Sequence, residues 1–280
     1  MTLRDTLAET SARILRRDAE TLLAHVLGHP RAWLLAHPEE ELDAAQAETF
    51  LGLAARRAAG EPLQYLTGVQ EFYGLSLRVT PEVLIPRPET EHLVEAVILW
   101  ATQFHDGRIL RIADVGTGSG AIAIALATHL AGVALVAIDQ SEGALAVAEE
   151  NAHALGCRER ITFLRNDLLK DLSSALPHYP PFDAIVSNPP YIPLGDAATM
   201  QVEVVQHEPH SALFAGDDGL AIYQRLIPQA HAALHPCGLL AMEIGFGQRP
   251  ALEELLVDWS NVRFVDDYAG IPRIVLAERV

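Results

Sequence analysis

The sequence predicts an α/β protein in which a mostly parallel, seven-stranded sheet follows a small α-helical domain and a β-hairpin linker. Three observations predict this. Apolar residues recur at helical spacing up to Gly74, seven short apolar runs follow from residue 109 on with helical segments between them, and a glycine-rich turn directly follows the first run. We therefore divide the 280 residues into a helical domain (1–74), a hairpin linker (75–88) and a sheet domain (89–280).

The first domain shows three helical patterns. Apolar residues three and four positions apart begin at Leu3, and a second set ends at Gly28, which suits a helix C-terminus. Asp43 is a candidate N-cap for a third helix that stops at Gly60. Nothing in this segment has the spacing of a catalytic motif.

The linker is predicted from alternation. Leu75, Leu77 and Val79 alternate with polar residues, Pro81 and Glu82 form a turn, and residues 83–85 give a second strand. Pro86 and Pro88 stiffen the exit into a helix expected over residues 89–104.

The remaining chain alternates strand and helix, which implies a mainly parallel sheet covered on both faces. Helices are expected over 121–130, 141–155 and 220–234. The expected strands are 109–115, 134–138, 161–164, 182–186, 239–244, 262–265 and 274–277.

Composition narrows the class of partner. The net charge is −17 with a pI near 5.0, and Lys170 is the only lysine. A protein that binds nucleic acid normally presents a basic face, so we expect no direct nucleic-acid partner and favour a basic protein surface. The N-terminus lacks a signal-peptide core and no apolar stretch is long enough to span a membrane. We expect a cytoplasmic monomer with two reduced cysteines and no membrane contact.

A glycine-rich turn, DVGTGSG at residues 114–120, separates the first strand from its helix. Glycine allows the backbone to approach a ligand closely, and the helix start behind it offers free N–H groups. Asp139 ends the second strand, where an acidic residue accepts hydrogen bonds from a ribose. The pattern predicts an adenosine-type cofactor but does not choose between a dinucleotide and a methyl donor.

A second motif, Ser187-Asn-Pro-Pro-Tyr191, directly follows a predicted strand and indicates the type of reaction. The side-chain oxygen of Asn188 and the carbonyl of Pro189 can accept both hydrogens of an NH₂ group, and Tyr191 offers a flat face to a planar group. Such a grip raises electron density on a poorly nucleophilic amide nitrogen and stabilises the positive charge that develops during methyl transfer. Neither a metal nor a strong general base is required.

These motifs, taken together, resemble the PrmC/HemK family of protein glutamine methyltransferases that act on peptide chain release factors. The resemblance rests on EPLQYLTGVQEFYG (61–74), LIPRPETEHLVE (84–95), DVGTGSGAIAIALA (114–127), SNPPYIP (187–193) and HEPHSALFAGDDGL (207–220). NPPY is shared with enzymes that methylate the amino group of adenine, whereas the PRPETE segment after a small helical domain is much more specific. The resemblance implies a Rossmann-like class I methyltransferase domain.

The resemblance also implies a role for each site residue. The cofactor is S-adenosylmethionine, held by Gly116, Thr117, Gly118, Ser119, Gly120, Asp139, Asp167, Leu168 and Asn188. The substrate pocket is formed by Asn188, Pro189, Pro190 and Tyr191, of which Asn188, Pro189 and Tyr191 are expected to be catalytic. The implied substrate is the side-chain nitrogen of the glutamine in the Gly-Gly-Gln motif of class I release factors. The resemblance further implies that the helical domain (1–74) recognises this substrate by contacting the factor elsewhere. Leu168 replaces an aromatic residue of some relatives, which favours apolar packing over ring stacking.

Three alternative functions remain compatible with parts of this sequence. A methyltransferase of a nucleic-acid base would use the same NPPY pocket but would call for a basic cleft. A nicotinamide oxidoreductase would use the glycine turn and leave NPPY without a role. A binding module with a vestigial pocket would not need an intact NPPY. His207 and His210 are three apart, but Pro209 disfavours a regular helix there, and we expect no metal.

Overall fold

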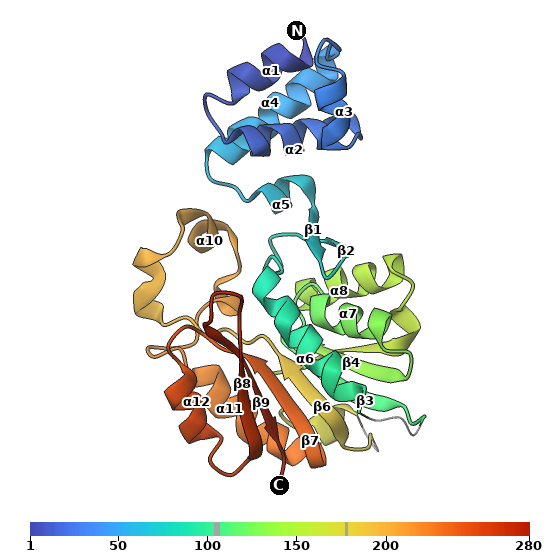
Figure 1. Ribbon diagram of the computed structural model, residues 1–280, viewed down its shortest axis with the longest axis vertical. Helices are drawn as coiled ribbons and strands as arrows, with labels where there is room; N and C mark the ends of the chain where they lie inside the picture. The colour runs from blue at the N-terminus through green and yellow to red at the C-terminus, as the bar shows by residue number, and fades with distance from the viewer. Residues whose placement is uncertain (104–106, 177–178) are drawn as a thin grey trace. The chain divides into compact units, whose positions relative to one another are not determined.

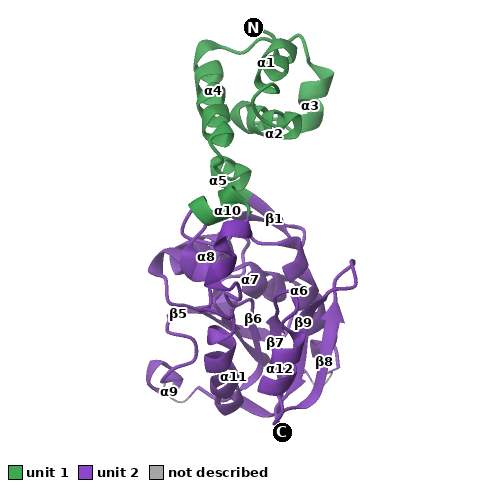
Figure 2. Cartoon of the chain, turned by 90° about the vertical axis from the view of Figure 1, so that its left-hand side faces the viewer, with its two compact units in different colours: residues 1–69, 201–207 green, residues 70–200, 208–280 purple. Residues whose placement is uncertain are grey.

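The computed structural model describes residues 1–103, 107–176 and 179–280 and divides into two compact units (Figures 1 and 2). The first unit contains residues 1–69 and 201–207, and the second contains residues 70–200 and 208–280. In the described part, no helix is long and apolar enough to cross a membrane.

The first unit is helical. Its core packs Leu22 and Leu23 against Phe50, and the expected terminators are present: Gly28 adopts a left-handed conformation (φ 66°), and Asp43 forms a capping box with Gln46. Its helices are α1 (Leu3–Thr10), α2 (Arg16–Leu27), α3 (Arg31–Ala36), α4 (Ala44–Ala58), α5 (Leu63–Thr67) and α10 (Val202–His207).

The second unit is built on a seven-stranded sheet with the order β5-β4-β3-β6-β7-β9-β8, which confirms the α/β prediction (Figure 1). Neighbours among β5, β4, β3, β6 and β7 pair in parallel, and β9 is antiparallel to both β7 and β8. The strands are β3 (Leu110–Val115), β4 (Val133–Asp139), β5 (Ile161–Arg165), β6 (Phe182–Ser187), β7 (Leu234–Glu243), β8 (Ser260–Asp266) and β9 (Pro272–Glu278).

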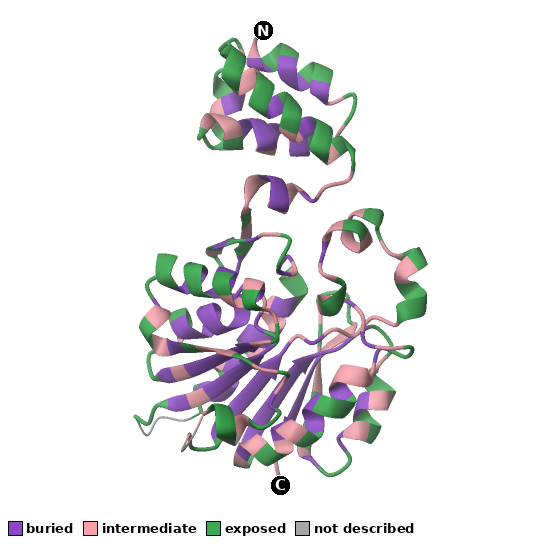
Figure 3. Cartoon of the chain, turned by 180° about the vertical axis from the view of Figure 1, so that it is seen from behind, coloured by how far each residue is buried: buried purple, intermediate pink, exposed green. Residues whose placement is uncertain are grey.

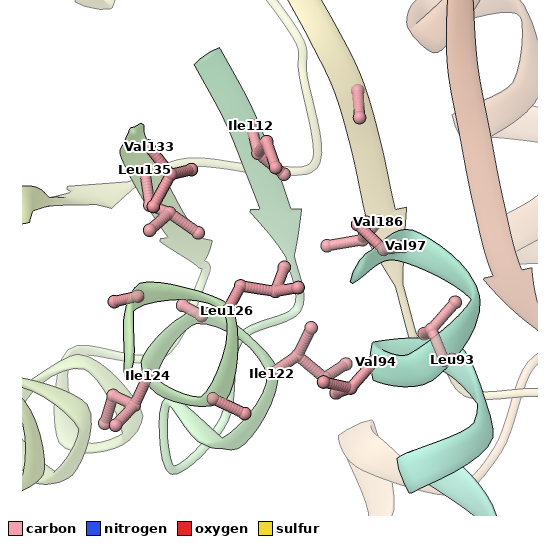
Figure 4. Close-up of a cluster of buried hydrophobic side chains, with 14 of the residues drawn as sticks. Leu93, Val94, Val97, Ile112, Ile122, Ile124, Leu126, Val133, Leu135 and Val186 are labelled. Atoms are coloured by element: carbon pink, nitrogen blue, oxygen red, sulfur yellow. The ribbon is translucent and has the colours of Figure 1, made fainter. Parts of the chain in front are cut away.

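Helices cover both faces of this sheet, because strands whose residues are apolar on both sides must be shielded from water on both faces. The central strands are almost wholly buried (Figure 3). On one face, α6 and α7 pack their aliphatic side chains against β3, β4 and β6 (Figure 4). The other face packs against α11 and α12. The helices are α6 (Glu91–Ala101), α7 (Ala121–His129), α8 (Glu142–Ala154), α9 (Leu172–Ala175), α11 (Ala221–Ala233) and α12 (Arg249–Leu255).

The hairpin lies earlier than predicted. Its strands are β1 (Val69–Phe72) and β2 (Leu75–Arg78), and no strand forms over residues 83–85, so its placement at 75–88 was wrong. The turn consists of Tyr73 (φ 51°) and Gly74 (φ 72°), and two consecutive positive φ values suit the right-handed twist of a two-residue hairpin. The following helix begins after a 3₁₀ turn at Pro88–Thr90 and ends at Ala101; the expected end at residue 104 lies outside the described residues.

Candidate active site

The carboxyl ends of three neighbouring parallel strands bring the predicted motifs to one rim of the sheet. In the register of β3, Val115 pairs with Ile138 of β4 on one side and with Ser187 of β6 on the other. The glycine turn, Asp139 and the NPPY segment each begin within one residue of these paired positions. Motifs far apart in the sequence therefore meet because of the strand order.

The glycine turn depends on backbone conformations that side chains disfavour. Gly116, Gly118 and Gly120 all have positive φ values, of 76°, 54° and 83°. The N–H of Gly116 donates to the carbonyl of Ile138 at 2.8 Å, and the N–H of Gly118 donates to Oδ2 of Asp139 at 3.0 Å. The turn is thus hydrogen-bonded to the end of the neighbouring strand.

The remaining residues of the turn face the protein. The hydroxyl of Thr117 donates to Oδ2 of Asp114 at 2.7 Å, and the carbonyl of Ser119 accepts a hydrogen bond from Asn151 at 2.9 Å. A Cβ on Gly120 would lie 2.9 Å from Cδ1 of Ile124. These three positions fix the shape of the turn and bring α7 close to α8.

A cavity of about 420 Å³ lies at this rim, a size typical of small-molecule sites. Among the described residues that line it are Gly116, Gly118, Asp139, Asp167, Leu168, Asn188, Pro189 and Pro190. Thr117, Ser119, Gly120 and Tyr191 are not among the lining residues. The structure therefore gathers eight of the twelve predicted site residues around one cavity, and the other four do not line it.

Asp139 is arranged to accept more hydrogen bonds than the protein supplies. Its Oδ2 accepts from Gly118 and its Oδ1 accepts from the N–H of Ser141, both at 3.0 Å. Each carboxylate oxygen has two lone pairs, so each can still accept one hydroxyl. This matches a ribose diol.

The opposite end of the cavity contains a strained apolar residue. Leu168 has a φ of 52°, which costs a non-glycine residue on the order of 1–2 kcal/mol. The side chain of Asn166 donates to the carbonyl of Leu168 at 3.0 Å, and the next N–H donates to Gln229 at 2.8 Å. These bonds hold Leu168 as an apolar wall beside Asp167, whose carboxylate pairs with Arg225 at 2.5 Å.

A buried ion pair joins two loops that line the cavity. Arg87 donates to Oε1 of Glu208 at 2.5 Å, and the N–H of Ile85 donates to Oε2 at 3.2 Å. The Glu208 side chain is 1% exposed. The pair therefore connects the segment before α6 to the segment before α11.

A hydrogen-bond chain that the sequence did not reveal runs behind NPPY. Nδ2 of Asn188 donates to the hydroxyl of Thr90 at 3.0 Å, and this hydroxyl donates to Oε2 of Glu243 at 2.6 Å. The hydroxyl of Tyr191 donates to Oε1 of the same carboxylate at 3.1 Å, and burial raises the pKa of this hydroxyl. Tyr191 therefore supports the pocket from behind, through Glu243.

The residues around the cavity fit S-adenosylmethionine. The glycines admit a close backbone approach, Asp139 suits a ribose and Leu168 suits a flat apolar ring. Burial raises the pKa of Asp114 to about 7. Among the described residues, Oδ1 of Asp114 has no hydrogen-bond partner; it is buried beside the turn and does not line the cavity. Within the same described residues, no group of three or more His, Cys, Asp or Glu side chains is placed to hold a metal ion.

Comparison with solved structures supports the fold. The hMettl16 catalytic domain, solved with an RNA hairpin, matches with a TM-score of 0.58 at 17% identity, covering 98% of this chain and 91% of that one. A 16S rRNA methyltransferase from T. thermophilus, solved with AdoMet and guanosine, matches with a TM-score of 0.52 at 20% identity, covering 76% and 50%. At these identities the likeness establishes the class I methyltransferase fold alone.

Comparison of sequences goes further. Residues 2–68 match the model of the PrmC N-terminal domain, and residues 95–216 match that of the methyltransferase small domain. Relatives named release factor glutamine methyltransferase are 44% identical in Koribacter versatilis (94% of this chain, 91% of the relative), Moorella thermoacetica (100% and 99%) and Bordetella pertussis (97% and 97%). With similarity of this extent over both units, the chain belongs to the release factor glutamine methyltransferase family, as the motifs at residues 84–95 and 187–193 predicted.

Proposed function

We propose that this protein transfers a methyl group from S-adenosylmethionine to the side-chain amide nitrogen of the glutamine in the Gly-Gly-Gln motif of class I peptide chain release factors. The observation that carries the proposal is the position of Asn188 and Pro189 on the wall of the same cavity as Gly116, Gly118 and Asp139. Family membership supplies the substrate class, because the relatives are named for release factor glutamine.

The residues of the pocket account for the chemistry. We assign Oδ1 of Asn188 and the carbonyl of Pro189 as acceptors of the two N–H bonds of the glutamine amide. S-adenosylmethionine supplies a methyl group activated by a sulfonium. The amide nitrogen forms the C–N bond as the C–S bond breaks, and the two acceptors stabilise the positive charge that develops on nitrogen. The methylated nitrogen then loses its extra proton to water.

The acidic character of the chain suits this substrate. With a net charge of −17, the protein attracts basic surface on a partner, and such steering weakens as salt screens it. We propose that the helical unit supplies contacts to the factor outside the glutamine loop. The Michaelis constant for the factor should then rise with ionic strength, and a salt-independent constant would refute the electrostatic part. The cytoplasmic location and monomeric state stay predictions.

Methylation of an adenine amino group is the alternative, because NPPY also serves that chemistry. The test uses methyl-labelled S-adenosylmethionine with an intact class I release factor, with the same factor carrying Gln→Ala in its Gly-Gly-Gln motif, and with DNA and RNA. Label on the intact factor alone supports the proposal. Label on nucleic acid, with none on either factor, would refute the proposed substrate and show that the site methylates a nucleic-acid base.

A further inference from the structure

We propose that Thr90 and Glu243 are positioning residues that determine which atom of the Asn188 amide faces the substrate. The proposal rests on the proposed function, since it concerns how the same pocket is set to accept an NH₂ group. It assigns a role to two buried polar side chains that line no wall of the cavity.

Thr90 is 4% exposed, so its hydroxyl needs hydrogen-bond partners within the protein. It is the last residue of the 3₁₀ turn at Pro88–Thr90 and has helical dihedral angles (φ −66°, ψ −19°), and its side chain makes no capping bond to α6. Its hydroxyl instead joins Asn188 and Glu243, which are 98 and 153 positions away in the sequence.

The direction of this chain follows from what each group can do. An ionised carboxylate only accepts hydrogen bonds, so the Thr90 hydroxyl must use its one hydrogen toward Glu243. Its oxygen can then only accept, and the NH₂ of Asn188 must be the donor. The carboxamide is thereby fixed with Oδ1 as the atom that it can present to the cavity. If the Asn188 carboxamide were turned by 180°, its NH₂ group would face the NH₂ group of the substrate glutamine, and neither can accept a hydrogen bond from the other.

Glu243 is held so that both of its oxygens accept. The hydroxyl of Tyr191 donates to Oε1, Thr90 donates to Oε2, and the hydroxyl of Tyr223 donates to the Glu243 backbone carbonyl. Burial has the largest effect on the pKa of this carboxyl and raises it above its ordinary value, although the hydrogen bonds from Thr90 and Tyr191 and the charge of Arg273 lower it; the nearby Glu89 raises it further. A protonated Glu243 would be a donor and could reverse the chain. The turnover number should therefore fall as the pH falls through this raised pKa.

The test compares isosteric and rescuing variants. Thr90→Val keeps the shape and removes the hydroxyl, Thr90→Ser restores it, and Thr128→Ala is the control, because Thr128 only bonds a backbone carbonyl within α7. Loss of one positioning hydrogen bond should lower kcat for release factor methylation about tenfold in Thr90→Val. The KM for the factor and the Kd of S-adenosylmethionine should change less than about twofold, and Thr90→Ser and Thr128→Ala should keep nearly full kcat.

The pH profile separates positioning from a general structural effect. The unmodified enzyme should lose kcat on the acid side, whereas Glu243→Gln, whose amide does not titrate and whose oxygen can still accept from Thr90, should show no such acid limb. Thr90→Val that stays folded by its melting temperature and keeps full kcat would overturn the inference. An acid limb that survives in Glu243→Gln would overturn it as well. Failure of the unmodified enzyme to methylate any release factor, while it binds S-adenosylmethionine, would instead overturn the proposed function.

Discussion

Replacing Asp139 by asparagine should weaken cofactor binding strongly while leaving the fold intact. The carboxylate accepts the N–H groups of Gly118 and Ser141, each at 3.0 Å, and has one acceptor site per oxygen left for a ribose hydroxyl. In Asp139→Asn one oxygen becomes an NH₂ donor and the other becomes a neutral amide oxygen, so one ribose hydroxyl loses its acceptor and the other loses a charged one. With charged hydrogen bonds contributing about 1.5–3 kcal/mol each, we expect a loss of about 2–3 kcal/mol.

This loss corresponds to a Kd for S-adenosylmethionine that is roughly 30- to 150-fold higher, which isothermal titration calorimetry can measure. Glu149→Gln is the matched control, because Glu149 pairs with Arg158 on the exposed side of α8 and an exposed pair contributes little. Its Kd should stay within about twofold. A Kd for Asp139→Asn within threefold of the unmodified protein would refute the assignment of Asp139 to the cofactor.

The other predictions concern stability, measured by chemical and thermal unfolding. Gly120→Ala adds a Cβ 2.9 Å from a neighbouring side chain at a position with a positive φ, and should lower the free energy of unfolding by about 2–4 kcal/mol. Gly156 also has a positive φ, but a Cβ there has no atom within 4 Å, so Gly156→Ala should lower it by only about 1 kcal/mol. Equal losses in the two variants would contradict the packing argument. Arg87→Ala leaves a buried carboxylate unpaired and should cost about 3–5 kcal/mol, against less than about 1 kcal/mol for the exposed pair lost in Arg249→Ala. The pKa of Asp114 is about 7 when folded and ordinarily 3.8, so its contribution to stability is full below pH about 4 and is lost as the pH rises to about 7. Asp114→Asn should flatten this dependence, and an unchanged slope would contradict it.

Much of the sheet domain could be predicted because its signals are local. A strand buried on both faces is a continuous apolar run, and this pattern located β3, β4 and β6 closely. The predicted strands also overlap the other four strands, but β7 begins at Leu234 rather than at residue 239, and β8 is a largely exposed strand that extends beyond the predicted residues 262–265. The glycine turn and NPPY each follow a strand directly, and the parallel register then places them on one rim. The helix terminators Gly28 and Asp43 were likewise readable from single residues.

The features that were missed depend on contacts distant in sequence or on unusual turns. The hairpin turn uses Tyr73 at a positive φ, which the sequence does not signal as an asparagine or aspartate would. Nothing local says that the hydroxyl of Thr90 bonds Glu243, or that Arg87 pairs with Glu208. Such pairings arise only when β7 and the segment before α11 are brought beside the segment before α6.

The most direct test of the central claim is mass spectrometry of a release factor after reaction with this enzyme and S-adenosylmethionine, comparing the unmodified enzyme with Asn188→Ala. Because Asn188 is also among the predicted cofactor residues, calorimetry measures the Kd of S-adenosylmethionine on the same preparations, and both enzymes are compared at saturating S-adenosylmethionine. We predict one added methyl group on the side-chain nitrogen of the Gly-Gly-Gln glutamine with the unmodified enzyme, and at least about a hundredfold slower methylation with Asn188→Ala. A methyl group on any other atom, or full methylation by Asn188→Ala, would contradict the account.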